Sequence, residues 1–235
     1  MIEFNCRALR AAIFCLAAAG LLAVGGCASL HDRVDNMAKT DPLEPVNRVM
    51  YQINDAGDHY VLRPVAKGYQ KTTPRVIRMG VGHFFENVTY PVVFFNDFLQ
   101  GKFRQGGADA SRFLVNTIVG LGGLFDPATE IGLGAHDEDF GQTLAVWGTP
   151  AGPFLMVPLL GPRTTAHLVG TLADNFVSPV ARYKNSDIRV GALALQTIHR
   201  RSTLLAVDEE LRKAFDPYVF IRDAYLQNRN YQIHD

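Results

Sequence analysis

The chain has 235 residues, and its 23 basic and 23 acidic side chains give a formal net charge of zero. A neutral chain lacks the basic surface that nucleic-acid binding requires, so we expect no nucleic-acid partner. Its three cysteines are Cys6, Cys15 and Cys27. Because all three lie near the N-terminus, the body of the chain has no pair of thiols for a disulfide or a thiolate zinc site.

The N-terminus has the features of a secretion signal that ends at a cysteine. Two arginines precede the apolar run 11–24, and Gly25 and Gly26 stand directly before Cys27. This run is shorter than the about 20 apolar residues of a membrane span, and the small residues suit a signal peptidase. The pattern resembles a bacterial lipoprotein signal, in which the cysteine is acylated. We therefore predict a signal peptide over 1–26 and a lipid anchor on Cys27, with an ordinary secretory signal as the alternative.

A polar segment follows the proposed anchor. Residues 28–40 contain few large apolar side chains, so we expect 27–40 to be a lipidated tether and 41–235 to be the folded domain. Ser29 occupies the position at which lipoprotein sorting in many Gram-negative bacteria recognises Asp as a signal for inner-membrane retention. Serine at this position indicates the outer membrane.

The first part of the domain contains helical patterns that are separated by prolines. Apolar residues recur at helical spacing from Pro45, and Arg63-Pro64 is predicted to end this helix. A second helix is expected to begin after Thr73-Pro74 and to end at Tyr90-Pro91. The segment 92–99 would then form a short and unusually aromatic element.

The rest of the chain alternates further helices with irregular stretches. A helix is expected over 106–118, before a glycine-rich stretch at 120–134, and four prolines prevent a continuous helix through 148–162. Further helices are predicted at 164–176, 187–207 and 217–227. Because few segments alternate at period two, the sequence predicts a mostly α fold, a single domain with Gly- and Pro-rich irregular loops.

The usual signatures of catalysis are absent from the sequence. It contains no Gly-x-Ser-x-Gly, His-Glu-x-x-His or Walker motif, and its histidines are scattered. The acidic segment 137–139 lacks the ligand spacing of a calcium site and is interpreted as a solvated loop. We therefore predict no enzyme, no metal and no cofactor. A hydrolase that brings Ser111 or Ser178 together with His167 and Asp174 in space is an alternative that the sequence order leaves open.

Five short motifs occur in order along the domain. They are Asp41-Pro42-Leu43-Glu44-x-x-Asn47-Arg48, Asn116-x-x-x-Gly120-x-Gly122-Gly123-x-x-Asp126-x-Ala128, Asp139-Phe140-Gly141-Gln142-Thr143-Leu144 with Trp147-Gly148, Gly152-Pro153-Phe154-x-x-x-Pro158-x-x-Gly161-Pro162, and Asp216-Pro217-Tyr218 with Arg222-Asp223-Ala224-Tyr225-x-Gln227. Together with the signal, they resemble the MlaA/VacJ family of outer-membrane phospholipid-transport lipoproteins. The resemblance extends from Asp41 to about Gln227.

The resemblance implies both a fold and a function. The expected fold is a ring of helices that lies in one membrane leaflet around an amphipathic channel, beside trimeric porins. The expected protein is anchored by lipid at the periplasmic face of the outer membrane. It would remove glycerophospholipids that have strayed into the outer leaflet and pass them to a soluble periplasmic carrier, which feeds an inner-membrane ABC transporter. A structural lipoprotein that clamps an envelope partner is the alternative.

Polar residues are needed along the path of a charged headgroup, because an unpaired charge in hydrocarbon is costly. Asn47 and Arg48 are our candidates for headgroup-facing residues, whereas Asp41 and Glu44 are better explained as capping and ion-pair residues of the first helix.

Two further candidate sites concern the backbone and the membrane. Residues Gly120, Gly122 and Gly123 are candidates for a channel or gating loop, since a helical ring can need flexible or closely packed backbone where it opens. A helix cap at Gly120 is the alternative. The aromatic side chains of the segment 92–99 are either seated in the membrane or part of the core, and the candidates for membrane seating are Phe94, Phe95 and Phe98.

Overall fold

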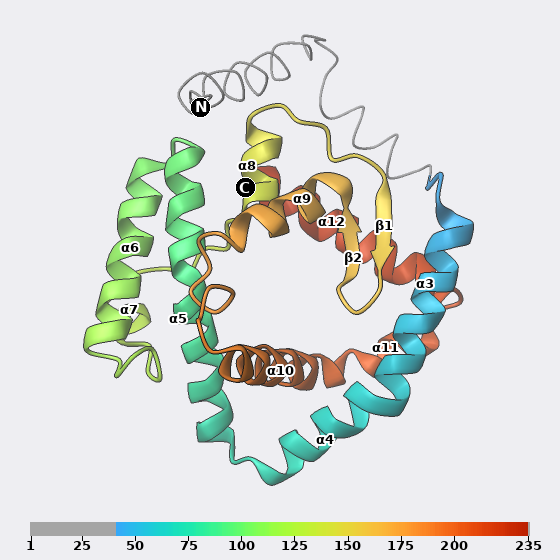
Figure 1. Cartoon of the computed structure of the whole chain (residues 1–235), viewed down its shortest axis with the longest axis horizontal. Coiled ribbons are helices and arrows are strands. Elements are labelled where there is room, and N and C mark those ends of the chain that lie inside the picture. The colour runs from blue at the N-terminus through green and yellow to red at the C-terminus, as the bar shows by residue number, and fades with distance from the viewer. Residues whose placement is uncertain (1–40, 235) are drawn as a thin grey trace, which may run out of the picture.

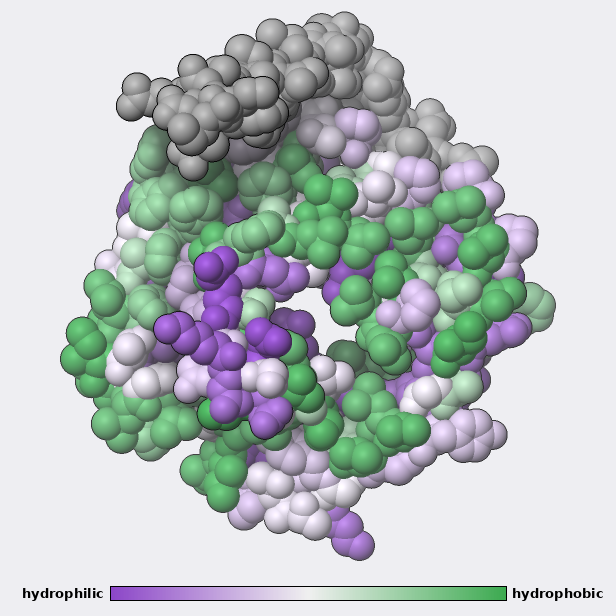
Figure 2. All heavy atoms as spheres, in the orientation of Figure 1, coloured by the Kyte–Doolittle hydropathy of each residue, from purple (hydrophilic) through white to green (hydrophobic). Residues whose placement is uncertain are grey.

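The structure is a computed structural model that describes residues 41–234. The predicted signal peptide, the tether and Cys27 therefore lie outside the described residues. Helices and one short hairpin close into a ring around a central opening (Figures 1 and 2). Within the described part, no helix is long and apolar enough to cross a membrane.

One continuous helical arm forms the N-terminal side of the ring. It consists of α3 (Glu44–Gly57), the π-helical turn η1 (Asp58–Leu62) and α4 (Arg63–Thr72). The prediction that Arg63-Pro64 ends the first helix is therefore wrong. Pro64 lies in the first turn of α4, where a missing N–H is tolerated. The turn before it is wide, because Arg63 N bonds to Asp58 O five residues back instead of four.

The longest helix, α5 (Arg75–Leu99), passes through a proline. Tyr90-Pro91 does not end it, and 92–99 is its last part rather than a separate element, so both predictions are wrong. An interior proline costs about 3 kcal/mol. Tertiary packing of α5 offsets this cost: the helix packs along α6 (Phe103–Ile118), and Val92 and Val93 directly after Pro91 are buried. Tertiary packing therefore outweighs the local preference of proline to end a helix.

The middle of the chain contains short elements. Helices α7 (Pro127–Glu130) and α8 (Phe140–Val146) follow the glycine-rich stretch, and each is capped by an aspartate side chain. The stretch 148–162 contains strand β1 (Phe154–Val157), which pairs antiparallel with β2 (Gly161–Thr164). Four-residue strands are too short for a period-two signal to reveal them.

The C-terminal third completes the ring. It consists of α9 (Thr165–Asp174), α10 (Ser186–Thr203), the 3-10 turn η2 (Leu204–Ala206), α11 (Asp208–Lys213) and α12 (Pro217–His234). The Asn185 side chain caps α10 by accepting from the backbone N–H groups of Asp187 and Ile188. The three predicted helices of this region are present, and the mostly α, single-domain fold is confirmed.

The interior of the ring body is unusually polar. Among the described residues, more polar than apolar side chains are buried, and the apolar cluster around Phe154, Met156 and Tyr218 is small. Large apolar side chains lie on the surface instead, as at Ile118 (74% exposed) and Phe176 (74% exposed). Figure 2 shows such hydrophobic residues over much of the visible face, with hydrophilic residues along part of the opening. Apolar surface of this extent marks a site of contact with a membrane or a partner.

Candidate functional site

The hairpin is attached to α3 by two asparagines, and its turn lies near the opening (Figure 1). Asn47 is 2% exposed, and its Nδ2 donates to Phe154 O at 3.0 Å while its Oδ1 accepts from Met156 N at 2.8 Å. Asn54 repeats this pattern with Val157 O at 2.9 Å and Leu159 N at 2.8 Å. Side-chain amides therefore take the place of a neighbouring strand at the free edge of β1.

The first sequence motif also contacts the last one. Arg48 donates to Asp216 at 2.8 Å and to Glu44 at 2.8 Å, and its guanidinium lies 4.6 Å from the centre of the Tyr218 ring. The Tyr218 hydroxyl donates to the Asp41 carboxylate. The hydrogen bond from Arg48 lowers the pKa of Asp216.

These contacts assign structural roles to both residues that were predicted to face headgroups. Asn47 is buried and its amide is engaged by the hairpin and by Asp41, whereas the Arg48 side chain is 38% exposed. Their headgroup role stays a prediction, and only Arg48 of the two retains a surface for it.

The glycine loop after α6 is tightly hydrogen bonded. Gly122 and Gly123 have φ values of 74° and 89°, in the left-handed region that glycine adopts without strain. Gly123 N donates to Asn116 O at 2.8 Å, and Phe125 N donates to Gly120 O at 3.0 Å. A Cβ atom on Gly120 would lie 2.4 Å from two backbone oxygens. The loop is thus a closely packed helix terminus, and its gating role stays a prediction.

A buried polar cluster connects this loop to α6. Asn116 Nδ2 and Arg112 Nη2 donate to the two oxygens of Asp126, at 2.9 Å and 2.6 Å. Desolvation raises the pKa of Asp126, but hydrogen bonds from Thr129, Asn116 and Arg112 outweigh it and lower the pKa to about 2. Asn116 also accepts from Ala128 N at 3.0 Å. The polar residues of the second motif therefore hold the loop in place.

The aromatic part of α5 has two faces. Phe95 and Phe98 are 46% and 40% exposed, whereas Val93 is 4% exposed on the opposite side. Phe94 is half-buried between Phe98 and Phe113, at ring distances of 6.4 Å and 6.1 Å. Phe95 and Phe98 thus present apolar surface outward, and their seating in a membrane stays a prediction.

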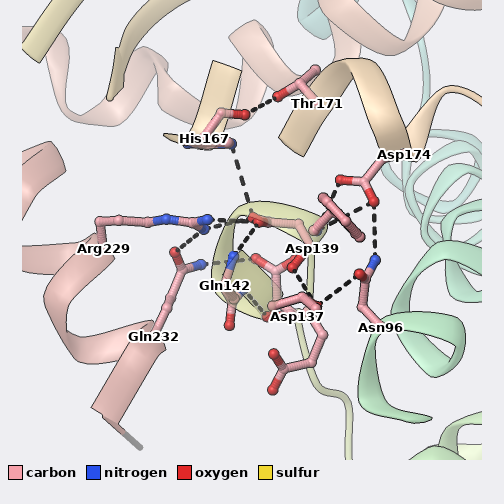
Figure 3. A network of polar contacts seen from close by, with 12 residues as sticks. Asn96, Asp137, Asp139, Gln142, His167, Thr171, Asp174, Arg229 and Gln232 are labelled. Carbon is pink, nitrogen blue, oxygen red and sulfur yellow. Dashed lines mark hydrogen bonds and ion pairs between the residues drawn. The ribbon is translucent and has the colours of Figure 1, made fainter. Parts of the chain in front are cut away.

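The acidic segment 137–139 lies at a junction of helices, and the solvated-loop interpretation is wrong for Glu138 and Asp139, whereas Asp137 is exposed. Glu138 is buried and pairs with Lys102 at 2.7 Å. Asp139 caps α8 and forms a bidentate pair with Arg229 of α12, at 2.5 Å and 2.6 Å (Figure 3). Sequence reasoning missed these residues because their partners lie 36 and 90 positions away.

Asp174 completes this junction from α9 (Figure 3). It accepts from Asn96 Nδ2 at 2.9 Å and from Phe140 N at 3.2 Å. Burial raises its pKa to about 6. Helices α5, α8, α9 and α12 therefore meet through polar side chains.

The described residues contain no assembled triad of the kind that the hydrolase alternative requires. Ser111 donates to Gly107 O of its own helix at 2.8 Å, and His167 Nδ1 is hydrogen bonded to the Tyr225 hydroxyl at 2.8 Å. No hydrogen bond within residues 41–234 joins Ser111 or Ser178 to His167. The same part of the chain contains no group of three His, Cys, Asp or Glu residues suited to a metal ion.

A cavity of about 700 Å³ lies between α5, α10 and residues 135–137. Its lining includes three arginines and three histidines, which are Arg75, Arg78, Arg200, His83, His136 and His199. This volume is in the usual range of small-molecule sites. Sequence patterns did not reveal this cavity, because its basic residues come from distant parts of the chain.

Comparisons with known proteins agree with this geometry. The family model described as MlaA lipoprotein matches residues 39–232. The intermembrane phospholipid transport system lipoprotein MlaA of Escherichia coli (strain K12) is 36% identical over 218 residues, which cover 91% of this chain and 86% of that protein. The protein of the same name from Haemophilus influenzae is 32% identical, with 91% and 87% covered. A solved structure described as the structural basis for maintenance of bacterial outer membrane lipid asymmetry is 34% identical, with a TM-score of 0.75, and the match covers 83% of this chain and all of that one.

Proposed function

The chain belongs to the MlaA lipoprotein family, and from this premise we propose that it removes mislocalised glycerophospholipids from the outer leaflet of the outer membrane. In this way it would maintain the lipid asymmetry of that membrane. The observation that carries the proposal is a helical ring with a polar interior, an apolar surface and an opening at its centre (Figure 2).

The physical requirements of lipid removal support this proposal. A phospholipid headgroup needs polar partners along its route, because an unpaired charge in hydrocarbon is costly. Its acyl chains need no such route. An opening that is bordered by hydrophilic and hydrophobic residues offers both environments (Figure 2).

The placement in the envelope is part of the proposal. Residues 1–26 are removed, Cys27 carries the acyl chains, 27–40 form the tether and 41–235 form the domain. Ser29 directs the protein to the outer membrane, where the domain lies at the periplasmic face. Several acyl chains anchor stably, since each buried methylene contributes about 0.8 kcal/mol. The exposed apolar side chains then seat the ring shallowly in one leaflet.

The proposed partners follow from the same resemblance. A trimeric porin lies beside the ring, and a soluble periplasmic carrier receives the lipid and delivers it to an inner-membrane ABC transporter. The relatives support this, since their name places them in an intermembrane phospholipid transport system.

A deletion strain tests the function. We expect phospholipid to accumulate in the outer leaflet, measured through the products of an outer-membrane phospholipase, and the wild-type gene to restore clearance. Cys27→Ala should not restore it, because the anchor is lost, whereas Cys15→Ala within the signal peptide should. An unchanged outer leaflet in the deletion strain would refute the proposal.

Purified protein separates the alternatives. Intact phospholipid that co-purifies favours transport, and a lysolipid product favours hydrolysis. Protein that carries neither favours a structural role.

A further inference from the structure

Three arginines that are shielded from solvent in this protein are paired with carboxylates, whereas those of the cavity between α5 and α10 have no such pair in the described range. Arg112, Arg201 and Arg229 each form an ion pair at 2.5–2.7 Å. By contrast, no hydrogen bond or ion pair joins the Arg78 guanidinium to any residue of the described range 41–234, and its Nε is buried. Since burying an unpaired charged donor is costly, Arg78 is a candidate for binding an anion.

A second unpartnered group lies in the same cavity. His83 Nδ1 is buried and has no hydrogen-bond partner within the described residues. His83 follows Arg78 by five positions on α5, and both line the cavity. The two side chains therefore line one cavity from a single helix.

Helix α10 contributes the opposite wall. Gly82 permits its close approach, since a Cβ atom there would lie 2.9 Å from His199 Nε2. The other ring nitrogen of His199 lies 3.3 Å from the Tyr69 hydroxyl of α4, which orients the ring. Arg200, the next residue, also lines the cavity and has no ion-pair partner among residues 41–234.

The charges of the lining favour an anion. Three arginines, Arg75, Arg78 and Arg200, face two carboxylates, Glu86 and Asp137. Asp137 already accepts from Gln232 Nε2 at 3.0 Å. The positive charge is therefore in excess, and it is concentrated where α5 and α10 meet.

We propose that this cavity binds the phosphate group of a phospholipid headgroup, with Arg78 as the principal binding residue and His83 and Arg200 as further donors. The identity of the lipid rests on the proposed function. The volume of about 700 Å³ suits a headgroup with its glycerol, and the long acyl chains would extend outside. Val93 and Phe85 supply apolar lining beyond the basic groups.

Calorimetric titration of the full-length protein in detergent tests this site. The probes are a short-chain phospholipid, dihexanoylphosphatidylglycerol, the phosphate-free dihexanoylglycerol and inorganic phosphate. We expect the phospholipid to bind, the diacylglycerol to bind at least tenfold more weakly, and inorganic phosphate to compete with the phospholipid.

Substitutions assign the binding to Arg78. Arg78→Gln should weaken phospholipid binding at least tenfold, and Arg78→Lys should restore part of it. Arg104→Gln, at an exposed arginine of α6 outside the cavity, should leave binding unchanged. If thermal melting shows that Arg78→Gln does not fold, Arg200→Gln replaces it as the test variant. Arg200 is an exposed residue of the cavity lining, and its substitution should weaken phospholipid binding several-fold.

The outcomes separate this proposal from the function. If folded Arg78→Gln binds the phospholipid with wild-type affinity, the proposed phosphate site is overturned. The same holds for Arg200→Gln if that variant is used instead. Accumulation of outer-leaflet lipid in the deletion strain would still support the proposed function. Binding of inorganic phosphate without binding of the phospholipid overturns the lipid assignment and indicates a free-phosphate site. Equal binding of phospholipid and diacylglycerol overturns the role of the phosphate.

Discussion

Asn47 and Asn54 hold the same strand from one side of α3. They lie seven residues apart, which is about 10.5 Å along a helix. Their targets on β1 begin at Phe154 and Val157, and three residues of a strand span about 10 Å. Because the helical and strand spacings match, each amide meets a carbonyl of β1, and the two N–H groups come from Met156 of β1 and from Leu159 in the turn after it.

We predict that the two asparagines differ in their contribution to stability. Asn47→Ala leaves two buried backbone groups, Phe154 O and Met156 N, without partners, at a cost of about 1–3 kcal/mol for each group. Asn54→Ala should cost less, because Leu159 is 94% exposed and water can replace the lost bond to its amide. Urea unfolding in detergent measures both. Equal losses would contradict the roles assigned to them.

The glycine loop predicts an order of effects for alanine substitution. Gly120→Ala should be the most damaging, by about 3 kcal/mol, because its Cβ would collide with backbone oxygens that cannot yield. Gly122→Ala meets no atom within 4 Å and should cost about 1 kcal/mol for its left-handed backbone. Thermal melting of the two variants checks this order, and Gly122→Asn should melt closest to the wild type.

The same variants separate a helix cap from a gate. If the loop only ends α6, folded Gly122→Ala clears outer-leaflet phospholipid as the wild type does. Our gating hypothesis predicts impaired clearance by Gly122→Ala at normal protein levels. Gly107→Ala, at an exposed glycine of α6 with free space around it, is the control.

A buried pair of carboxylates predicts how stability depends on pH. Asp97 and Asp109 are both 0% exposed. Desolvation, followed by the hydrogen bond and charge of Asp109, raises the pKa of Asp97 from 3.8 to about 8. A carboxyl with a raised pKa binds its proton more tightly in the folded state. Its contribution to stability is therefore complete at low pH and is lost as the pH rises towards 8.

We therefore expect the urea midpoint to fall as the pH rises from about 4 to about 8 and to level off above that, and Asp97→Asn to remove the part of this fall that lies above about pH 6. Asp174→Asn is the matched control, since burial raises the pKa of Asp174 only to about 6. Its effect should appear below pH 7. An unchanged slope in Asp97→Asn would exclude Asp97 as the titrating group.

Local sequence signals predicted α6, α9, α10 and α12, where helical spacing and turn residues agree with the fold. They failed at Pro91, because packing against α6 outweighs the proline penalty. They also failed at Glu138, since its partner Lys102 lies on another element. A local pattern contains no information about such partners.

The candidate site likewise has parts that the sequence predicted and parts that it did not. The five motifs correctly indicated the family, but they did not reveal that Asn47 holds the hairpin or that Arg48 pairs with Asp216. The basic cavity escaped notice because Arg78 and Arg200 are far apart in sequence. Composition identified the apolar residues, whereas only the ring explains why so many of them face outward.

The outward aromatic face of α5 provides the test of membrane seating. Phe95→Asp places a charge on a side chain that is 46% exposed, so the fold should melt nearly as the wild type does. If Phe95 lies in lipid, the charge should weaken the binding of anchor-free protein, residues 41–235, to phospholipid vesicles, because a charged group must then leave water. Val93→Asp is the control, since Val93 is 4% exposed on the same helix and a carboxylate there should destabilise the fold by several kcal/mol. Vesicle flotation and thermal melting distinguish the two positions. Vesicle binding by folded Phe95→Asp that equals the wild type would show that this face contacts water or a protein partner instead of lipid.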